Sequence, residues 1–165
     1  MSNLFFDKKG YIKACINGRN GFTIKNSILE LIQNSIDAGS TKIYINHNKN
    51  EDKLFIIDNG NGMTYDEIKD MSKLYKHNET SKDFKHGKFG IGAKQGWFQI
   101  GGNWVILSKK KNNENIVSLE WNVDKLIEWA YSNDSNNDNC IETSKNCTEE
   151  LKKIFNKYLI KSCNY

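Results

Sequence analysis

The stretch that decides the fold is residues 30–39, which read ELIQNSIDAG. At 3.6 residues per turn, the polar side chains of Glu30, Asn34 and Asp37 share one face of a helix. Gly39 stands where a left-handed residue would end that helix, so we predict a helix from about residue 25 to residue 39. The opposite face is apolar and would pack on a core; it carries Ile28, Leu31, Ile32 and Ile36.

That pattern has two interpretations. The polar face could hold a hydrated divalent cation and an activated water, because it offers two carboxylates and an amide. An ordinary amphipathic surface helix would show the same spacing. The helix alone favours the ordinary interpretation, and two glycine-rich segments further along the chain reverse that preference.

The first glycine-rich segment is DNGNGM at residues 58–63. It follows a predicted hairpin, with alternating residues at 41–46 and an apolar run at 53–58. A carboxylate at a strand end can accept a hydrogen bond from an exocyclic amine, and glycine lets the backbone approach a ligand closely. An asparagine–glycine turn capped by Asp58 is the simpler alternative.

The second segment is GKFGIGAKQG at residues 87–96, with the spacing GxxGxG. It would enter a helix over about residues 93–100, and backbone N–H groups at such an entrance can bind phosphate. Gly-Lys-Ser/Thr is absent, so this is not a Walker A loop. Before it, residues 77–86 are polar and without periodicity, which is typical of a functional loop.

The remaining elements are predicted from local signals. Thr64 and Glu67 form a capping box that opens a second helix. Strands are predicted at 104–109 and 116–122, a short helix at 123–131, and a last helix from Thr148 to about residue 160. The run at 132–139, rich in Ser, Asn and Asp, predicts a linker.

Composition limits the class of protein. The 165 residues fit one compact domain of ordinary composition, with 38% hydrophobic and 27% charged residues. No apolar run is long enough to span a bilayer, and residues 1–10 lack the apolar core of a signal peptide. We therefore expect an intracellular protein of the cytoplasm or nucleus, neither secreted nor membrane-bound. The four cysteines form no CxxC pair, so free thiols are expected and a zinc site is not.

Taken in order, the three motifs resemble those of the GHKL ATPase superfamily. It includes the ATPase component of DNA gyrase, the heat-shock protein of 90 kDa, histidine kinases and MutL. Residues 30–39 look like its N box, 58–62 like its G1 box, and 87–92 like its G2 box. The segment 90–96 and the strand after it are most similar to the MORC ATPases, while 77–82 is similar to the region before the lid of MutL. Histidine kinases fit less well, because their N box lacks the Asp-Ala-Gly ending.

The resemblance implies a fold: an α+β, two-layer α/β sandwich of the Bergerat type, with a mixed, mostly antiparallel sheet and helices on one face. The ATP-binding domain would span residues 1–131 and include a lid at about 76–92. A polar linker would follow at 132–147, and residues 148–165 would form a helix that begins a second domain.

The resemblance also implies roles on the first two motifs. Glu30 would activate the water that attacks the γ-phosphate, and Asn34 would bind Mg²⁺. Asp37 would support the metal ligand without binding the metal itself, or it would only fix the end of the helix. Asp58 would accept from the adenine amine, with Gly62 leaving room beside the ring. Gly60 and Met63 complete the nucleotide-binding residues of this segment.

The remaining ATP-binding residues implied by the resemblance lie on the lid and the second glycine-rich segment. Lys94 would neutralise phosphate charge, with a solvated surface lysine as the alternative. The others form the lid candidates Thr80, Ser81 and Lys82 and the segment Gly87, Lys88, Phe89, Gly90, Ile91, Gly92 and Ala93.

The function implied is Mg²⁺-dependent ATP binding and hydrolysis, slow in an isolated domain, with ATP-gated lid closure and homodimerisation. A role on DNA or chromatin, as in MORC or MutL proteins, follows from family analogy only. Two alternatives stay open: a non-catalytic ATP-binding switch, and a kinase of the histidine-kinase branch. In the related branches a lysine from a following domain reaches the γ-phosphate, and this sequence of 165 residues does not supply that domain.

Overall fold

The computed structural model describes residues 9–10, 23–72, 97–98, 100–132 and 141–163, with the side chains of Ser72 and residues 159–163 excepted. Its elements confirm the α+β class. In chain order they are α2 (Ile24–Asp37), β1 (Ile43–Asn48), β2 (Lys53–Asp58), α3 (Tyr65–Ser72), β3 (Asn103–Lys109), β4 (Ile116–Asn122), α5 (Val123–Tyr131), β5 (Ile141–Ser144) and α6 (Glu149–Cys163).

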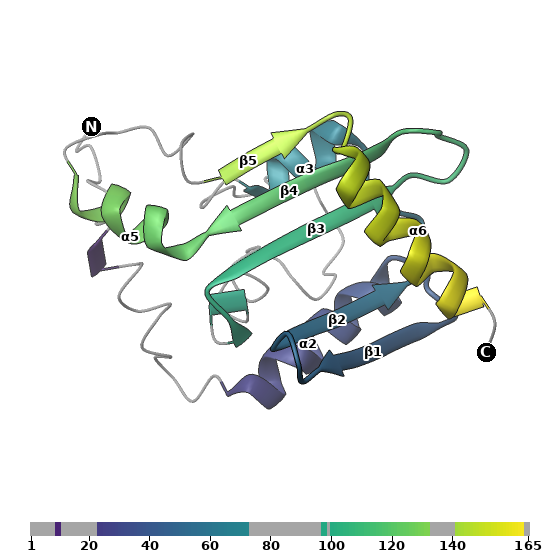
Figure 1. Ribbon diagram of the computed structural model, residues 1–165, viewed down its shortest axis with the longest axis horizontal. Coiled ribbons are helices and arrows are strands. Elements are labelled where there is room, and N and C mark those ends of the chain that lie inside the picture. The colour runs from purple at the N-terminus through teal and green to yellow at the C-terminus, as the bar shows by residue number, and fades with distance from the viewer. Residues whose placement is uncertain (1–8, 11–22, 73–96, 99, 133–140, 164–165) are drawn as a thin grey trace, which may run out of the picture.

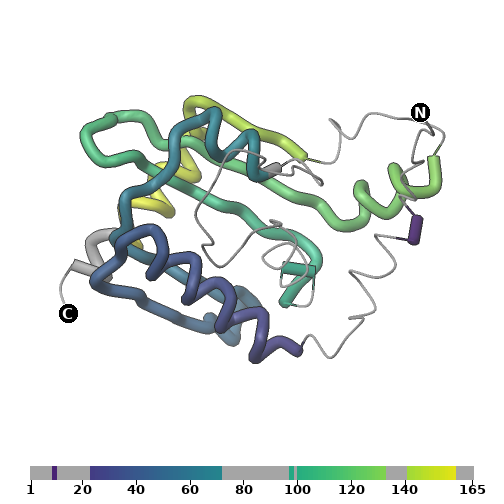
Figure 2. Tube along the Cα trace, turned by 180° about the vertical axis from the view of Figure 1, so that it is seen from behind, coloured from purple at the N-terminus to yellow at the C-terminus, as the bar shows by residue number. Residues whose placement is uncertain are grey.

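The strands form two antiparallel sheets, β1-β2 and β3-β4-β5, where the sequence predicted one mixed sheet. Within the described residues no ladder joins β2 to β3. Helices α2 and α3 lie on one face of the strands and α6 lies on the other, as the two opposite views show (Figures 1 and 2). Helix α6 crosses the strands on that second face, where Tyr158 stacks on Phe55 with ring centroids 4.3 Å apart.

Helix α2 has a defined cap at each end. The Thr23 side chain accepts from the Asn26 amide at 3.2 Å, which makes Thr23 the N-cap. At the other end the Gly39 and Ser40 amides donate to the Ile36 and Ser35 carbonyls, with Gly39 at φ +76°. This is a Schellman motif, and it confirms the predicted role of Gly39 in ending the helix.

The buried side of α2 differs from the predicted one. Ser27 and Ser35 are its buried residues, and Leu31 between them packs against the hydrophobic core. Ile36, predicted to be in the core, has 51% of its surface exposed, and Leu29 has 52%. Two small serines spaced eight apart let the helix lie close to its neighbours, so the buried stripe runs along the serines and the isoleucine stripe is only partly covered.

The core lies between the three-stranded sheet and helices α3 and α5. Its buried members are Ile68, Trp97, Val117, Leu119, Trp121, Leu126, Trp129 and Ala130. The Trp104 ring stacks on Trp121 with centroids 5.0 Å apart and planes 14° apart, and Trp97 contacts Trp104 at 4.0 Å. Burial of such large aromatic surfaces dominates core energetics, so these tryptophans hold β3 against β4 and the segment just before β3.

The capping box is confirmed, since the Glu67 amide donates to Thr64 Oγ1 at 3.3 Å and the Thr64 amide donates to Glu67 Oε2 at 2.6 Å. The range 132–147, predicted as linker, contains the strand β5, which pairs with β4 from Ile141 to Ser144. The buried thiol of Cys147 closes this range, and it is free as expected. No helix in the described part of the chain is long and apolar enough to cross a membrane.

Candidate functional site

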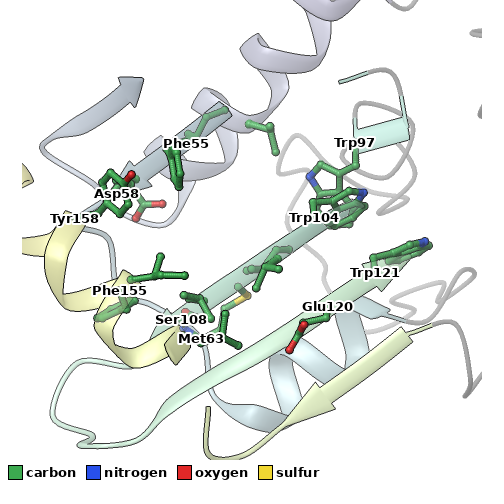
Figure 3. Close-up of a pocket in the computed structure, with 18 of the residues that line it drawn as sticks. Phe55, Asp58, Met63, Trp97, Trp104, Ser108, Glu120, Trp121, Phe155 and Tyr158 are labelled. Carbon is green, nitrogen blue, oxygen red and sulfur yellow. Dashed lines mark hydrogen bonds between the residues drawn. The ribbon is translucent and has the colours of Figure 1, made fainter. Parts of the chain in front are cut away.

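A large open cleft of about 2340 Å³ separates the α2/β1-β2 half from β3. Its walls come from α2, β2, the turn after β2, β3 and α6. In Figure 3, Phe55 and Asp58 stand on the β2 side, and Trp104 and Ser108 stand on the β3 side. The walls are mainly apolar, and Asn34 and Asp58 both lie among the polar residues that line the cleft.

The Asp58 carboxylate is held by three hydrogen-bond donors. Oδ1 accepts from the Gly60 amide at 2.8 Å and from Ser40 Oγ at 2.9 Å. Oδ2 accepts from Ser35 Oγ at 3.1 Å. Since an ionised carboxylate oxygen offers about two acceptor sites, Oδ1 is saturated and Oδ2 can take a further donor. The predicted ligand-binding carboxylate is therefore oriented before any ligand arrives.

The turn after β2 packs tightly on the end of α2. A Cβ atom at Gly60 would lie 2.7 Å from Ser40 Oγ and 3.0 Å from Ala38 Cβ, so only glycine fits there. The Asn59 side chain accepts from the Thr41 and Lys42 amides, each at 2.9 Å. The helix end, the start of β1 and the end of β2 therefore form one hydrogen-bonded unit around Asp58.

The same turn contacts the β3-β4 hairpin on its other side. The Met63 amide donates to the buried hydroxyl of Ser108 at 2.7 Å, and the Lys111 amide donates to the Asn61 carbonyl at 3.1 Å. Gly62 has φ +65°, and a Cβ there would overlap the Lys109 carbonyl oxygen. Gly62 is thus required because β3 packs closely against its backbone. The sequence predicted only that Gly62 leaves room beside a base and did not reveal this packing role.

The three polar residues of α2 have different surroundings. Asn34 is exposed and lines the cleft. Asp37 is exposed and accepts from Gln33 Nε2 at 3.0 Å, one turn earlier on the same helix. Glu30 is also exposed, and it is not among the described residues that line the cleft. The structure therefore brings Asn34 and Asp58 to one cleft and leaves Glu30 outside its walls.

The remaining predicted site residues lie outside the described part of the chain. This holds for the predicted lid at 76–92 as a whole. It also holds for the residues Thr80, Ser81, Lys82, Gly87, Lys88, Phe89, Gly90, Ile91, Gly92, Ala93 and Lys94. Their roles stay predictions.

Three serines of the site were missed by sequence reasoning. Ser35 and Ser40 bind Asp58, and Ser108 binds the turn that follows it. Ser35 had a usable signal, since it lies inside the 30–39 stretch at a helical position next to apolar residues. Ser40 and Ser108 had none, because their partners lie 18 and 45 positions away.

An ion pair links α3 to the hairpin beside the site. Lys110 Nζ lies 3.1 Å from Glu67 Oε1, and the capping bond from the Thr64 amide reaches the same carboxylate. The Thr64 N–H and then the Lys110 ammonium hold the pKa of Glu67 below its usual value. This surface pair adds modestly to stability and fixes the loop that follows β3.

The oxygen donors of the cleft suit magnesium better than a transition metal. No group of three or more His, Cys, Asp or Glu side chains in the described ranges could hold a metal ion. Mg²⁺ commonly binds through one or two protein oxygens together with phosphate and water. Asn34 is exposed and lines the cleft, and an amide side chain carries an oxygen that suits that manner of binding.

Comparison with known proteins agrees with this geometry. No curated protein matches the sequence. The model of one protein family, described as histidine kinase-, DNA gyrase B-, and HSP90-like ATPase, matches residues 22–152. That match covers most of the chain and includes α2, the turn after β2 and the β3-β4-β5 sheet. The chain therefore belongs to the histidine kinase-, DNA gyrase B-, and HSP90-like ATPase family, whose domains bind ATP.

Proposed function

We propose that this chain binds ATP in the cleft between α2 and β3 and hydrolyses it with Mg²⁺. The observation that carries the proposal is that Asn34 and Asp58, which are 24 positions apart in the sequence, line the same cleft. An amide oxygen and an oriented carboxylate at two points of one cleft suit a ligand with a metal-bound end and an amine-bearing end.

The base would bind at Asp58. Its Oδ2 atom accepts one hydrogen bond, from Ser35, and retains capacity for another donor. The exocyclic amine of adenine supplies such a donor, whereas a carbonyl oxygen at the same position would face a carboxylate and be repelled. The apolar side chains of the cleft, such as Met63 and Ile57, would then exclude water around the ring.

The phosphates would extend toward Asn34, whose carbonyl oxygen would hold Mg²⁺. When bound, the ion would neutralise charge on the phosphate oxygens. Glu30 stands one turn before Asn34 on the same helix. As general base, its carboxylate would take a proton from water while the water oxygen bonds to the γ-phosphorus. The bond from that phosphorus to the bridging oxygen then breaks, and ADP leaves with the electron pair.

The finer parts of this function rest on the family resemblance. They are closure of a lid over residues 76–92 on ATP, homodimerisation in the closed state, and a MORC-like or MutL-like role on DNA or chromatin. The lid lies outside the described residues. Turnover by the chain alone would be slow, because closure and dimerisation gate the chemistry in this kind of ATPase.

A second candidate, from another class, is an ATP-binding switch without turnover. The exposed position of Glu30, outside the walls of the described cleft, favours it. In that case ATP would order the cleft for a partner protein, and no base would be needed.

The proposal is tested by calorimetric titration of the full chain with ATP and Mg²⁺, beside measurement of phosphate release. We expect saturable binding of one ATP per chain and slow release of phosphate. Asp58→Asn should weaken binding by about tenfold or more, because a hydrogen bond to a charged group is lost. Asp124→Asn, an exposed aspartate in the first turn of α5, is the matched control and should bind as the unmodified chain does.

Each outcome has a definite meaning. Equal affinities of Asp58→Asn and the unmodified chain would contradict the proposed site. ATP binding without Mg²⁺-dependent phosphate release would contradict hydrolysis and favour the ATP-binding switch without turnover.

A further inference from the structure

We propose that the cleft between β2 and β3 is a docking site for an extended segment of a partner protein, which binds as an additional strand between the two. The inference goes beyond the proposed function and does not depend on nucleotide binding. It starts from the sheet topology, in which β2 and β3 each pair on one side only.

The unpaired edges of the two strands face each other. Strand β2 pairs with β1 and strand β3 pairs with β4, so each has one edge without a ladder in the described part of the chain. In both views β2 and β3 lie side by side, with β1 and β4 on their outer sides (Figures 1 and 2). Every residue of both strands, 53–58 and 103–109, lines the cleft. An unpaired edge presents backbone N–H and C=O groups with which an added strand can pair.

The two halves are joined at one end of the cleft. The Met63 amide donates to Ser108 Oγ at 2.7 Å, and the Lys111 amide donates to the Asn61 carbonyl at 3.1 Å. Both strands therefore end beside the same turn and run in the same direction. Among the described residues, no backbone hydrogen bond joins 53–58 to 103–109. The paired part of an occupant is thus limited to about the length of these strands, which have six and seven residues.

Both edges lack the features that protect natural sheet edges. Residues 54–57 read LFII and residues 104–107 read WVIL, so neither run contains a charge or a proline. Natural proteins place charges or proline on an open edge, or cover it, because an apolar edge recruits other strands. Phe155 and Tyr158 of α6 line the cleft on one face of the strands, but α6 is a helix and forms no ladder with either edge (Figure 3). The two edges therefore suit a strand that carries apolar side chains.

The size of the cleft also favours a polypeptide occupant. Its volume is about 2340 Å³, whereas pockets for small molecules typically have about 300–1,000 Å³. A nucleotide held at Asp58 and Asn34 would therefore fill only part of the space. The rest is bordered by the strand edges of β2 and β3 and by mainly apolar side chains, which suit an extended backbone better than a second polar small molecule.

Charge at the joined end of the cleft defines the chemistry of the partner. Lys109 and Lys111 are exposed and line the cleft beside the turn. In the described ranges neither ammonium group makes an ion pair, whereas Lys110 between them pairs with Glu67. Acidic side chains at the adjoining end of a bound strand would supply the missing counter-charges. The partner segment therefore combines alternating apolar residues with acidic residues at one end.

The test selects ligands for the full chain, without nucleotide, from a library of random peptides displayed on phage. The affinity of the selected peptide is then measured by fluorescence anisotropy. The unmodified chain is compared with the double variant Lys109→Glu/Lys111→Glu. A second double variant, Lys25→Glu/Lys49→Glu, is the control, because it changes the net charge equally at exposed positions that do not line the cleft.

We expect the selected peptides to share alternating apolar residues and an acidic end. The Lys109→Glu/Lys111→Glu variant should bind them about threefold to tenfold more weakly, as the loss of two exposed ion pairs implies, and the control should bind as the unmodified chain does. Amide hydrogen exchange in residues 53–58 and 103–109 should slow by about tenfold or more in the complex, because the added strand pairs with both edges. A peptide that is N-methylated at alternate residues should not bind, since it lacks the donors for one edge.

Three results would overturn the inference. The first is that no peptide is enriched. The second is that the selected peptides bind without slowing exchange in β2 and β3, or bind equally well to the Lys109→Glu/Lys111→Glu variant. The third is full protection of both edges in the chain without peptide, which would mean that β2 and β3 pair with each other. None of these results bears on ATP binding at Asp58, which the calorimetric titration tests separately.

Discussion

Ser35 Oγ lies 3.1 Å from Asp58 Oδ2, which joins the last turn of α2 to the last residue of β2. The bond spans 23 positions of sequence and connects the stretch at residues 30–39 with the glycine-rich segment at residues 58–63. Ser40 and Gly60 bind the other oxygen of the same carboxylate. The consequence is that helix and strand end form one rigid unit, and Asp58 is oriented by the fold.

Gly62→Ala should destabilise the protein strongly. The residue has φ +65°, and a Cβ there would overlap the Lys109 backbone, so either the turn or β3 must move. We expect a loss of about 2–4 kcal/mol in the free energy of unfolding, measured by urea denaturation. Gly101→Ala is the matched control, since a Cβ at Gly101 meets nothing within 4 Å. Equal stabilities of the two variants would contradict the tight packing of the turn on β3.

Leu119→Ala should open a cavity in the core of the three-stranded sheet. Leu119 is fully buried, and truncation of such a residue removes transfer free energy and leaves a void. We expect a loss of about 2–5 kcal/mol in the free energy of unfolding. Val105→Ala, at a neighbouring strand position with 46% of its surface exposed, should cost far less. A small loss at Leu119 would mean that β4 is not the centre of the core.

Glu67 makes the stability of α3 depend on pH. Its pKa is lowered in the folded protein, first by the Thr64 amide and then by Lys110, from an unfolded value near 4.5. The unfolded chain therefore binds this proton more readily in acid. The stabilisation is present above about pH 4.5 and is lost as the pH falls through the lowered folded value.

Glu67→Gln tests that dependence. The neutral variant should lose less stability than the unmodified chain between pH 6 and pH 3, by up to about 1 kcal/mol, because the carboxylate is half exposed. Urea denaturation at several pH values measures it, with Glu128→Gln on the exposed side of α5 as control. Parallel pH curves for Glu67→Gln and the unmodified chain would show that the capping box carries no such charge effect.

Glu30→Gln separates hydrolysis from binding. If Glu30 is the general base, the rate of phosphate release should fall by about a hundredfold or more, since proton transfer by a positioned side chain contributes that much. ATP affinity should change little, because the proposed role of Glu30 is to take a proton from the attacking water and not to contact the nucleotide. A Glu30→Gln variant that releases phosphate as fast as the unmodified chain would exclude Glu30 as the base. Glu128→Gln, at an exposed position, is the control substitution.

Local patterns predicted the parts of this fold that local interactions determine. The Schellman ending at Gly39 and the Thr64–Glu67 capping box both follow from residues within one turn of each other. The paired positions of Asp58 and Gly60 were also predictable, because a strand end followed by alternate glycines has few other solutions. Of the three polar residues that helical spacing placed on one face, Asn34 lines the cleft, together with Ile28 and Leu31 of the predicted apolar face.

The rest depended on packing between distant segments. Helical periodicity separates a polar from an apolar side, but the covered side of α2 is centred on Ser27, Leu31 and Ser35, so Ile36 is half exposed. The separation of β2 from β3 depends on strand edges that no local signal encodes. The sequence did not predict strand β5, because a strand of four residues that follows a polar run is too short to show a recognisable alternation of apolar and polar residues.

The central claim is that Asp58 reads the base of a nucleotide bound in the cleft beside Asn34. A crystal structure of the full chain with a non-hydrolysable ATP analogue and Mg²⁺ tests it most directly. We predict the adenine amine within hydrogen-bonding distance of Asp58 Oδ2 and the Asn34 oxygen among the metal ligands. An analogue bound with its base away from Asp58, or at a surface other than this cleft, would contradict the account.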